Sequence, residues 1–299
     1  MHGVSKHEWF RAGSFRERAN WLMVLGLATI STLLAGCNAG NGATAALAGS
    51  TSGSATAAYY YTPGVDTTWQ IQLQGTVNTG YNVAVYDIDL FDTPTTLIDD
   101  LHLAGHRVIC YFSAGSYENW RPDKDQFLSS DLGNNLSGWP GERWLDIRSD
   151  NVRSIMLARL DMAAAKGCDG VDPDNVDGYS NKSGFPLTAA DQLAYNRFLA
   201  DAAHGRGLAV GLKNDLEQVK KLVASFDFAV NESCHEYDEC DMLAPFPTAG
   251  KPVFHIEYTS SYVNDPSARA ALCADSAARR FRTLVLPEAL DDSFRFSCD

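Results

Sequence analysis

Three aspartates crowd the end of one apolar run. Residues 170–179 read GVDPDNVDGY, which places Asp172, Asp174 and Asp177 close together. Like charges at this spacing repel one another, so a ligand or a chemical role is expected to compensate them. The alternative is a turn with no chemical role, because Asp, Pro, Asn and Gly also favour tight bends. Taken alone, the stretch indicates a catalytic site and a simple turn about equally.

Polar side chains recur at the C-terminal ends of other apolar runs. They are Asp87, Asp89, Ser113, Asp146, Lys213, Asn214, Glu232 and Glu257. The C-terminal strand ends are the face on which barrel enzymes build their active sites. Helix capping explains some Asp and Ser positions, but Glu is a poor N-cap, and Glu232 and Glu257 lie in the apolar runs AVNE and HIEY. The pattern therefore favours a site over a series of turns.

These polar ends belong to a chain that alternates strands and helices from Asn82 onward. Eight strands are predicted, over residues 83–89, 107–113, 144–147, 170–174, 208–214, 226–232, 253–258 and 283–286. Helices are predicted over 95–104, 151–166, 188–205, 216–224 and 266–278, and Thr188 with Asp191 forms a capping box. Eight such units predict a single-domain (β/α)8 TIM barrel, with 69–73 as an extra N-terminal strand. A doubly wound open sheet is the alternative, but no GxGxxG follows the first strand.

An acidic pocket with aromatic neighbours suits carbohydrate. The aromatic residues on or near the same loops are Trp69, Tyr111, Trp120, Trp139, Tyr179 and Tyr258. Sugar rings stack on aromatic faces, hydroxyls bond to Asp, Asn and Lys, and a pair of carboxylates can cleave a glycosidic bond. Core packing is the competing explanation for any single aromatic residue.

The N-terminal segment is predicted to be a lipoprotein leader. Four basic residues precede the apolar run 21–35, which is short for a membrane span and ends in Leu-Ala-Gly-Cys37. That ending resembles a lipobox, so residues 1–36 are expected to be the signal peptide and Cys37 the lipidated residue. An ordinary signal peptide with an incidental cysteine is the alternative. Residues 37–58, rich in Gly, Ala, Ser and Thr, predict a flexible tether, and 59–299 the enzyme domain.

The exported part is strongly acidic. The chain carries a net charge of −13, and residues 1–36 hold four Lys/Arg against two Glu, so the remainder carries −15. Such a field repels nucleic acid and attracts cationic partners, although acidity also serves solubility. We expect a monomer that meets the membrane only through its lipid anchor, on the periplasmic or cell-surface face, or else a secreted protein.

Six of the seven cysteines remain after Cys37, an even number that permits disulfides in an exported protein. Cys234 with Cys240 would close a short loop, and Cys273 with Cys298 would tie down the C-terminal tail. Cys110 and Cys168 lie in apolar runs and are either paired or buried thiols. Because there is no CxxC pair and the histidines are scattered, neither a metal nor a cofactor is expected.

Several long segments of the chain resemble a known family. The segments VICYFSAGSYENWRPD, KGCDGVDPDNVDGY, GLAVGLKNDLEQV and FDFAVNESCHEYDEC are similar to glycoside hydrolase family 114, the endo-α-1,4-polygalactosaminidases. The resemblance covers most of 69–258. It implies a (β/α)8 barrel without a cofactor and retaining endo-cleavage of a cationic, partly deacetylated α-1,4-galactosamine polymer. It also implies Asp174 as nucleophile and Glu232 as acid/base. Asp172 departs from the Glu expected there.

Substrate contacts are expected from the remaining polar and aromatic residues of the strand ends. They are Asp87, Asp89, Tyr111, Ser113, Trp120, Asp172, Tyr179, Lys213, Asn214, Glu257 and Tyr258. Asp87 and Asp89 are expected to pair with substrate ammonium groups. Two other functions stay open: a non-catalytic carbohydrate-binding lipoprotein, and a hydrolase that modifies polysaccharides of another linkage.

Overall fold

The computed structural model describes residues 60–299. The predicted leader (1–36), Cys37 and the tether (37–58) lie outside these residues. Within 60–299, no helix is both long and apolar enough to cross a bilayer.

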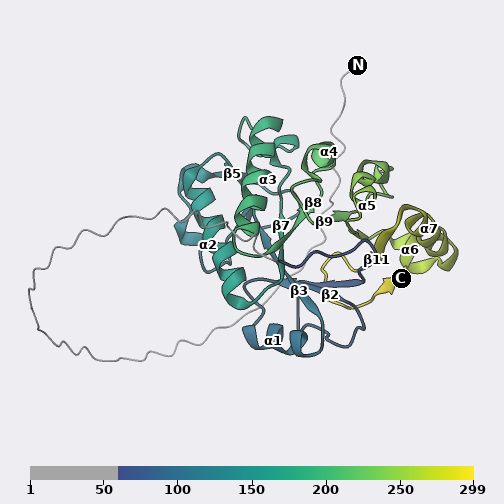
Figure 1. Cartoon of the computed structure of the whole chain (residues 1–299). Helices are drawn as coiled ribbons and strands as arrows, with labels where there is room; N and C mark the ends of the chain where they lie inside the picture. The colour runs from purple at the N-terminus through teal and green to yellow at the C-terminus, as the bar shows by residue number, and fades with distance from the viewer. Residues whose placement is uncertain (1–59) are drawn as a thin grey trace, which may run out of the picture. The chain divides into compact units, whose positions relative to one another are not determined.

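A nine-stranded sheet forms the centre of the described part (Figure 1). Its strands are β1 (Trp69–Gln72), β2 (Val85–Asp89), β3 (Arg107–Ser113), β7 (Gly170–Asp174), β8 (Ala209–Lys213), β9 (Phe228–Glu232), β10 (Val253–Glu257), β11 (Phe281–Val285) and β12 (Phe296–Ser297). The first eight are parallel and adjacent in that order, and β12 pairs antiparallel with β11. The chain therefore has the predicted α/β barrel type of fold.

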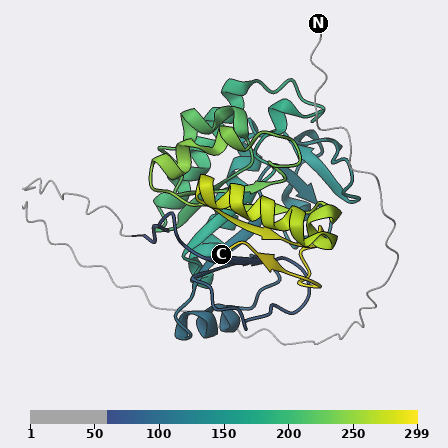
Figure 2. The ribbon, with the colours of Figure 1, turned by 90° about the vertical axis from the view of Figure 1, so that its right-hand side faces the viewer.

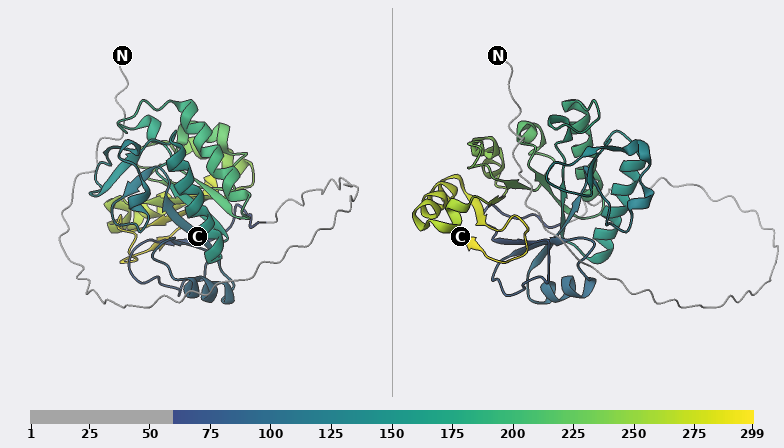
Figure 3. Two further views of the ribbon diagram at one scale, coloured as in Figure 1. Left: turned by 90° about the vertical axis from the view of Figure 1, so that its left-hand side faces the viewer. Right: turned by 180° about the vertical axis from the view of Figure 1, so that it is seen from behind.

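The sheet curls until its two ends approach each other. Trp69 on β1 donates its indole N–H to the Arg282 carbonyl on β11 at 2.8 Å. Arg295, just before β12, donates to Gln70 Oε1 at 2.6 Å and to the Trp69 carbonyl at 3.2 Å. In the view from behind in Figure 3, the yellow C-terminal strand accordingly lies beside the blue N-terminal strands. The C-terminal segment thus bridges the seam of the barrel.

Two apolar cores follow from the two-residue period of the strands. Alternate residues such as Trp69, Ile71, Val230 and Phe254 fill the inside of the curled sheet. The other set, with Ile88 among its members, packs outward against the helices. Because parallel strands are covered on both faces, they read as nearly continuous apolar runs in the sequence.

Helices cover the outside of the sheet (Figures 1 and 2). They are α1 (Thr95–Leu103), α2 (Asp150–Lys166), α3 (Ala189–His204), α4 (Val219–Leu222), α5 (Pro245–Thr248), α6 (Ser260–Asn264) and α7 (Pro266–Arg279). Five short 3-10 helices join them: η1 (Lys124–Gln126), η2 (Ser129–Asp131), η3 (Gly178–Ser180), η4 (Leu216–Gln218) and η5 (Cys240–Leu243). The capping box at Thr188 and Asp191 is confirmed, since each side chain bonds to the backbone N–H of the other residue.

Two strand assignments from the sequence are wrong. The run 144–147 overlaps β6 (Glu142–Leu145) only at its first two residues. β6 is no barrel strand but the centre of a separate antiparallel sheet with β4 (Ser116–Glu118) and β5 (Leu132–Asn135). The run 69–73 is no extra strand, because β1 is the first of the eight parallel strands and pairs with β2. A run of only four residues has too little pattern to reveal whether its partners are parallel or antiparallel.

All six cysteines of the described part are paired. The disulfides join Cys110 to Cys168, Cys234 to Cys240, and Cys273 to Cys298. The first ties β3 to the turn before β7. The last ties α7 to the C-terminal tail, as its sequence spacing suggested.

Candidate active site

Charged side chains converge at the C-terminal mouth of the barrel. In the register of the parallel strands, Tyr111 lies opposite Asp172, and Ser113 lies opposite Asp174. The next strand, β8, contributes Lys213, and β9 contributes Glu232. Four adjacent strands, β3, β7, β8 and β9, thus place their last inward-facing residues at one site, as the strand-end pattern predicted.

Lys213 is the hub of this group. Its Nζ lies 3.6 Å from Asp172, 3.6 Å from Asp174 and 3.8 Å from Glu232. Burial disfavours the ammonium charge, but the surrounding carboxylates outweigh it and hold the pKa of Lys213 above its usual value. Since Lys213 is only 2% exposed while Asp174 and Glu232 are 18% and 29% exposed, the two carboxylates face the mouth above a buried cation.

Asp174 and Glu232 are each held in place through both oxygens. The Tyr111 hydroxyl donates to Asp174 Oδ2 at 2.8 Å, and the Asn175 backbone N–H donates to Oδ1 at 2.7 Å. Glu232 accepts from the Tyr258 hydroxyl at 2.6 Å and from the Asn214 amide at 3.2 Å. Tyrosine and amide donors of this kind fix the orientation of a carboxylate and satisfy its charge.

Two further acids lie deeper in the barrel. Asp87 and Asp172 are fully buried, and within 60–299 their oxygens accept no hydrogen bond. Burial is the largest cause that raises the pKa of Asp172 to about 7, with Lys213 opposing it. Burial and the nearby Asp172 charge raise the pKa of Asp87 well above its usual range. Because the pKa of Asp172 lies near 7, the group carries less negative charge at neutral pH than its residue count suggests.

Unusual backbone conformations follow the three strands that carry the charged side chains. Asn175 after β7, Asn214 after β8 and Ser233 after β9 have φ of 61°, 49° and 60°. Residues other than glycine adopt this left-handed region at a cost, and such strain gathers at functional sites. Here the left-handed conformation turns the backbone sharply at the end of each strand, just beyond Asp174, Lys213 and Glu232.

Gly115 allows the chain to approach β7 closely. The backbone N–H groups of Ala114 and Gly115 both donate to the Asp174 carbonyl, at 2.8 and 3.0 Å. A Cβ at position 115 would lie 1.7 Å from the Asn175 carbonyl oxygen. Only glycine fits here without moving the segment that orients Asp174.

Gly115→Ala is therefore expected to lower both stability and turnover. The displaced backbone should cost about 1–3 kcal/mol of unfolding free energy, and kcat should fall at least about tenfold because Asp174 shifts. Urea unfolding and initial rates measure the two effects. Gly64→Ala is the control, since nothing lies within 4 Å of a Cβ there; equal effects at both positions would remove this role of Gly115.

Of the other predicted contacts, two bond within the site and two lie outside this network. Ser113 Oγ accepts from the Asn175 amide at 2.9 Å, and the Asn214 amide donates to Glu232. Trp120 follows β4 and is 51% exposed. The Tyr179 hydroxyl donates to Glu217 at 3.0 Å.

Asp89 and Glu257 are corrections to the sequence analysis. The Asp89 carboxylate is buried and held by both terminal nitrogens of Arg121, at 3.0 and 2.6 Å, so it is not free to pair with a substrate ammonium. Glu257 lies on the outer face of β10, where its carboxylate contacts His235 and His255. Both residues end a strand, but Arg121 engages Asp89 and Glu257 lies on the outer face, so neither is available to a substrate.

Sequence reasoning missed a network behind Asp174. Glu142 Oε2 accepts from the Ser116 hydroxyl at 2.6 Å, and Ser116 Oγ lies 2.6 Å from Ser113 Oγ, which accepts from Asn175. Glu142 belongs to the antiparallel side sheet, so no strand-end rule could have identified it. Burial raises its pKa to about 7.

This pKa predicts a pH-dependent stability. The folded pKa of Glu142 exceeds that of an unfolded Glu, so its stabilising effect is complete below about pH 4.5 and is lost as pH rises through about 7. As pH rises from about 5 to about 8, the wild type should therefore lose about 1–3 kcal/mol of unfolding free energy relative to Glu142→Gln. Denaturant unfolding at both pH values measures it. Exposed Glu288→Gln should show no such gain, and a flat difference for Glu142→Gln would refute the assignment.

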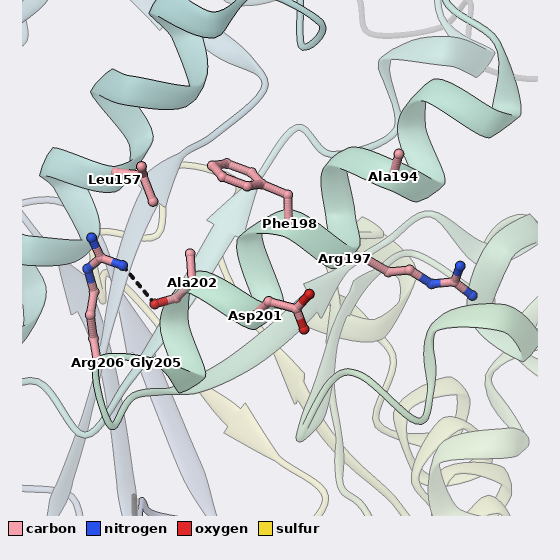
Figure 4. A pocket seen from close by; sticks show the side chains of 8 residues that line it. All are labelled: Leu157, Ala194, Arg197, Phe198, Asp201, Ala202, Gly205 and Arg206. Atoms are coloured by element: carbon pink, nitrogen blue, oxygen red, sulfur yellow. Dashed lines mark hydrogen bonds between the residues drawn. The ribbon is translucent and has the colours of Figure 1, made fainter. Parts of the chain in front are cut away.

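A surface cavity of about 740 Å³ lies elsewhere, on the outside between α2 and α3 (Figure 4). Its lining includes Phe198, Arg197 and Arg206. Arg206 is already bonded to Asp161 and to the Ala202 carbonyl. None of the strand-end carboxylates lines this cavity.

Comparison with known proteins adds a family to this geometry. The model of glycoside-hydrolase family GH114 matches residues 50–299. The crystal structure of Aspergillus fumigatus Ega3 in complex with galactosamine is 48% identical, covers 80% of this chain and 98% of that one, and superposes with a TM-score of 0.75.

Two more distant proteins are similar to parts of this chain. The glycoside hydrolase domain of PelA from Pseudomonas aeruginosa has a similar fold, with a TM-score of 0.59 and 15% identity over 76% of this chain and 96% of that one. An uncharacterized protein of Deinococcus radiodurans is 28% identical over 224 residues, 64% of this chain and 72% of its own.

Proposed function

Because this chain belongs to glycoside-hydrolase family GH114, we propose that it is an exported endo-hydrolase of α-1,4-linked galactosamine polymers that retains the anomeric configuration. Family membership makes it a glycosidase that acts on O-glycosyl bonds. The polymer, the stereochemistry and the export are the proposal. The observation that carries it is the pair Asp174 and Glu232, exposed at the barrel mouth above the one ammonium of Lys213.

In the first step Asp174 attacks the anomeric carbon. Its oxygens are fixed by Tyr111 and Asn175, and the Lys213 ammonium lies 3.6 Å from Oδ1. Glu232 donates its proton to the oxygen of the leaving sugar as the glycosidic C–O bond breaks. The product of this step is a glycosyl ester on Asp174.

In the second step Glu232 acts as a base. It takes a proton from water, and the water oxygen attacks the anomeric carbon and displaces Asp174. Glu232 is the more exposed of the two carboxylates, which suits the residue that must meet both the leaving group and water. Two inversions at the same carbon leave an α-linked substrate as an α product.

The substrate assignment rests on charge and on similarity. Ega3, at 48% identity, was crystallised with galactosamine, and the acidic chain attracts a cationic polymer. Because Arg121 occupies Asp89 and Asp87 is fully buried, neither is available to a substrate ammonium group. The carboxylates that the reacting sugar can reach are Asp174 and Glu232. The distal sugars are assigned to Trp120 and Tyr179.

Export and anchoring complete the proposal. The basic leader, the small residues before Cys37 and the uncharged tether support a lipoprotein held outside the cytoplasm. Mass analysis of the membrane-extracted protein tests this: an acylated Cys37 at the N-terminus is expected, and an unmodified N-terminus elsewhere contradicts it.

The activity itself is tested with defined α-1,4-galactosamine oligomers, free and N-acetylated. Mass spectrometry should show shorter oligomers from internal cleavage of the free or partly acetylated chains. Binding without any shorter product would instead make the protein a carbohydrate-binding barrel.

A further inference from the structure

A second polar cluster lies behind β10, on the outer side of the sheet close to α7, the side that faces the viewer in Figure 2. It consists of His235, His255 and Glu257. The side chains of His255 and Glu257 are fully buried, and that of His235 is 12% exposed. The glycosidase chemistry proposed above uses none of the three, so their burial needs another explanation.

One nitrogen of each imidazole is held by a partner. His235 Nε2 lies 3.0 Å from Asp275 Oδ2, and His255 Nδ1 lies 3.1 Å from Thr283 Oγ1. Because the Thr283 hydroxyl donates to Ser276, it accepts from His255 Nδ1–H, which leaves a lone pair on His255 Nε2. Carboxylate and hydroxyl partners of this kind orient the histidines of metal sites.

The two remaining nitrogens face one carboxylate. His255 Nε2 is 3.1 Å and His235 Nδ1 is 3.5 Å from Glu257 Oε1. Within 60–299, His255 Nε2 and Glu257 Oε2 make no hydrogen bond of normal geometry. Glu257 Oε1 also accepts from the His235 backbone N–H at 2.9 Å. A buried carboxylate thus faces two imidazole lone pairs, and a cation between the three side chains would satisfy all of them.

The spacing fits a metal ion better than a single proton. A tetrahedral zinc site with Zn–N and Zn–O bonds of about 2.1 Å has ligand-to-ligand distances of about 3.4 Å. The observed 3.1 and 3.5 Å bracket that value. A proton on one imidazole nitrogen could form a hydrogen bond in only one of the two contacts with Glu257. A metal ion between the three side chains would bind both imidazoles and the carboxylate.

The Cys234–Cys240 disulfide forms the neighbouring wall. Its sulfurs lie 3.7 and 3.3 Å from His235 Nδ1. As a disulfide they are not thiolates, so they enclose the site rather than supply ligands. A cavity of about 330 Å³ lined by Cys240, Arg279 and Phe281 lies beside them and offers an entry path.

We propose that His235 Nδ1, His255 Nε2 and the Glu257 carboxylate bind one divalent transition-metal ion of the zinc class in the disulfide-intact protein. Two histidines and one carboxylate are a donor set that zinc accepts. The ion joins the loop after β9 to β10, directly behind Glu232 and Tyr258, and its role there is structural. It takes no part in glycoside cleavage.

The test uses the full chain without a histidine tag, with its disulfides intact, stripped by a chelator and then titrated with Co²⁺. One equivalent is expected to bind with the intense visible absorption of a four- or five-coordinate ion, to raise the unfolding midpoint and to be displaced by Zn²⁺. His235→Asn and Glu257→Gln should each weaken binding at least about tenfold. His102→Asn is the control, because His102 also pairs with a carboxylate, Asp169, but lies at a different site.

Two results would overturn the proposal. One is less than one equivalent of bound Co²⁺ at millimolar concentration, and the other is wild-type affinity in both variants. Circular dichroism and hydrolytic activity establish that the variants fold. If buried Glu257→Gln fails to fold, His235→Asn at its partly exposed position decides the question alone.

Discussion

Asp174→Asn is expected to fold normally and to lose at least about 10³-fold in kcat on every substrate, because it removes the nucleophile. Glu232→Gln is expected to lose as much on the natural polymer. On a galactosaminide with a good leaving group, however, Glu232→Gln should recover much of its first-step rate, because that bond breaks without an acid. Stopped-flow release of the leaving group measures this difference.

Asp177→Asn is the matched control, since it lies three residues beyond Asp174 in the turn. It should stay within about threefold of the wild type, as expected for a change outside the reacting group. Activity retained in Asp174→Asn or in Glu232→Gln would remove that residue from the catalytic pair. The opposite leaving-group behaviour would exchange the two roles.

Lys213→Met is expected to cost at least about 100-fold in kcat/KM, because the cation that the three carboxylates share is replaced by an uncharged side chain of similar length. Without it, the carboxylates of Asp172, Asp174 and Glu232, which all lie within 3.8 Å of the Lys213 ammonium, repel one another and move apart. The nucleophile and the acid then leave the geometry that the reaction needs. Initial rates of hydrolysis measure the loss of kcat/KM.

Asp172→Asn tests whether charge is the reason. Adding it to Lys213→Met removes one of the repelling carboxylates, so the double variant should recover part of the activity relative to Lys213→Met alone. An unchanged or deeper loss would mean that Lys213 acts through a direct contact with substrate rather than through the carboxylates.

The sequence predicted the strands that carry the chemistry well. β3 and β7 begin and end where the apolar runs do, and β9 and β10 differ only at one end. The runs of β3, β9 and β10 are rich in β-branched and aromatic residues, whereas the short run GVDPD of β7 lies between two segments of helical spacing. The error at 144–147 has a physical cause: the same short run pairs antiparallel with β4, and partner choice depends on a residue as remote as Ser116.

The part of the site that lies at the C-terminal ends of the strands could be predicted from the sequence. Asp174, Lys213 and Glu232 meet because parallel strands bring their C-terminal ends together. Glu257 was misplaced because a strand end says nothing about which face a residue occupies. Had the two-residue period been applied, Phe254, Ile256 and Tyr258 inside would have put Glu257 outside.

Other features were beyond the sequence altogether. The pairing of Asp89 with Arg121 and of Glu142 with Ser116 depends on how the side sheet folds over the barrel. The cluster of His235 and His255 joins residues 20 positions apart in the chain, and no ligand spacing marks it. Such contacts follow from tertiary packing, which local patterns do not encode.

Proton NMR during the first minutes of hydrolysis of a defined α-1,4-galactosamine oligomer tests the central claim most directly, since it detects new reducing ends and their configuration together. We predict that the α anomer forms first and then equilibrates, as double displacement through Asp174 requires. Initial release of the β anomer would contradict the two-carboxylate retaining mechanism, and the absence of any new reducing end would contradict the proposed substrate.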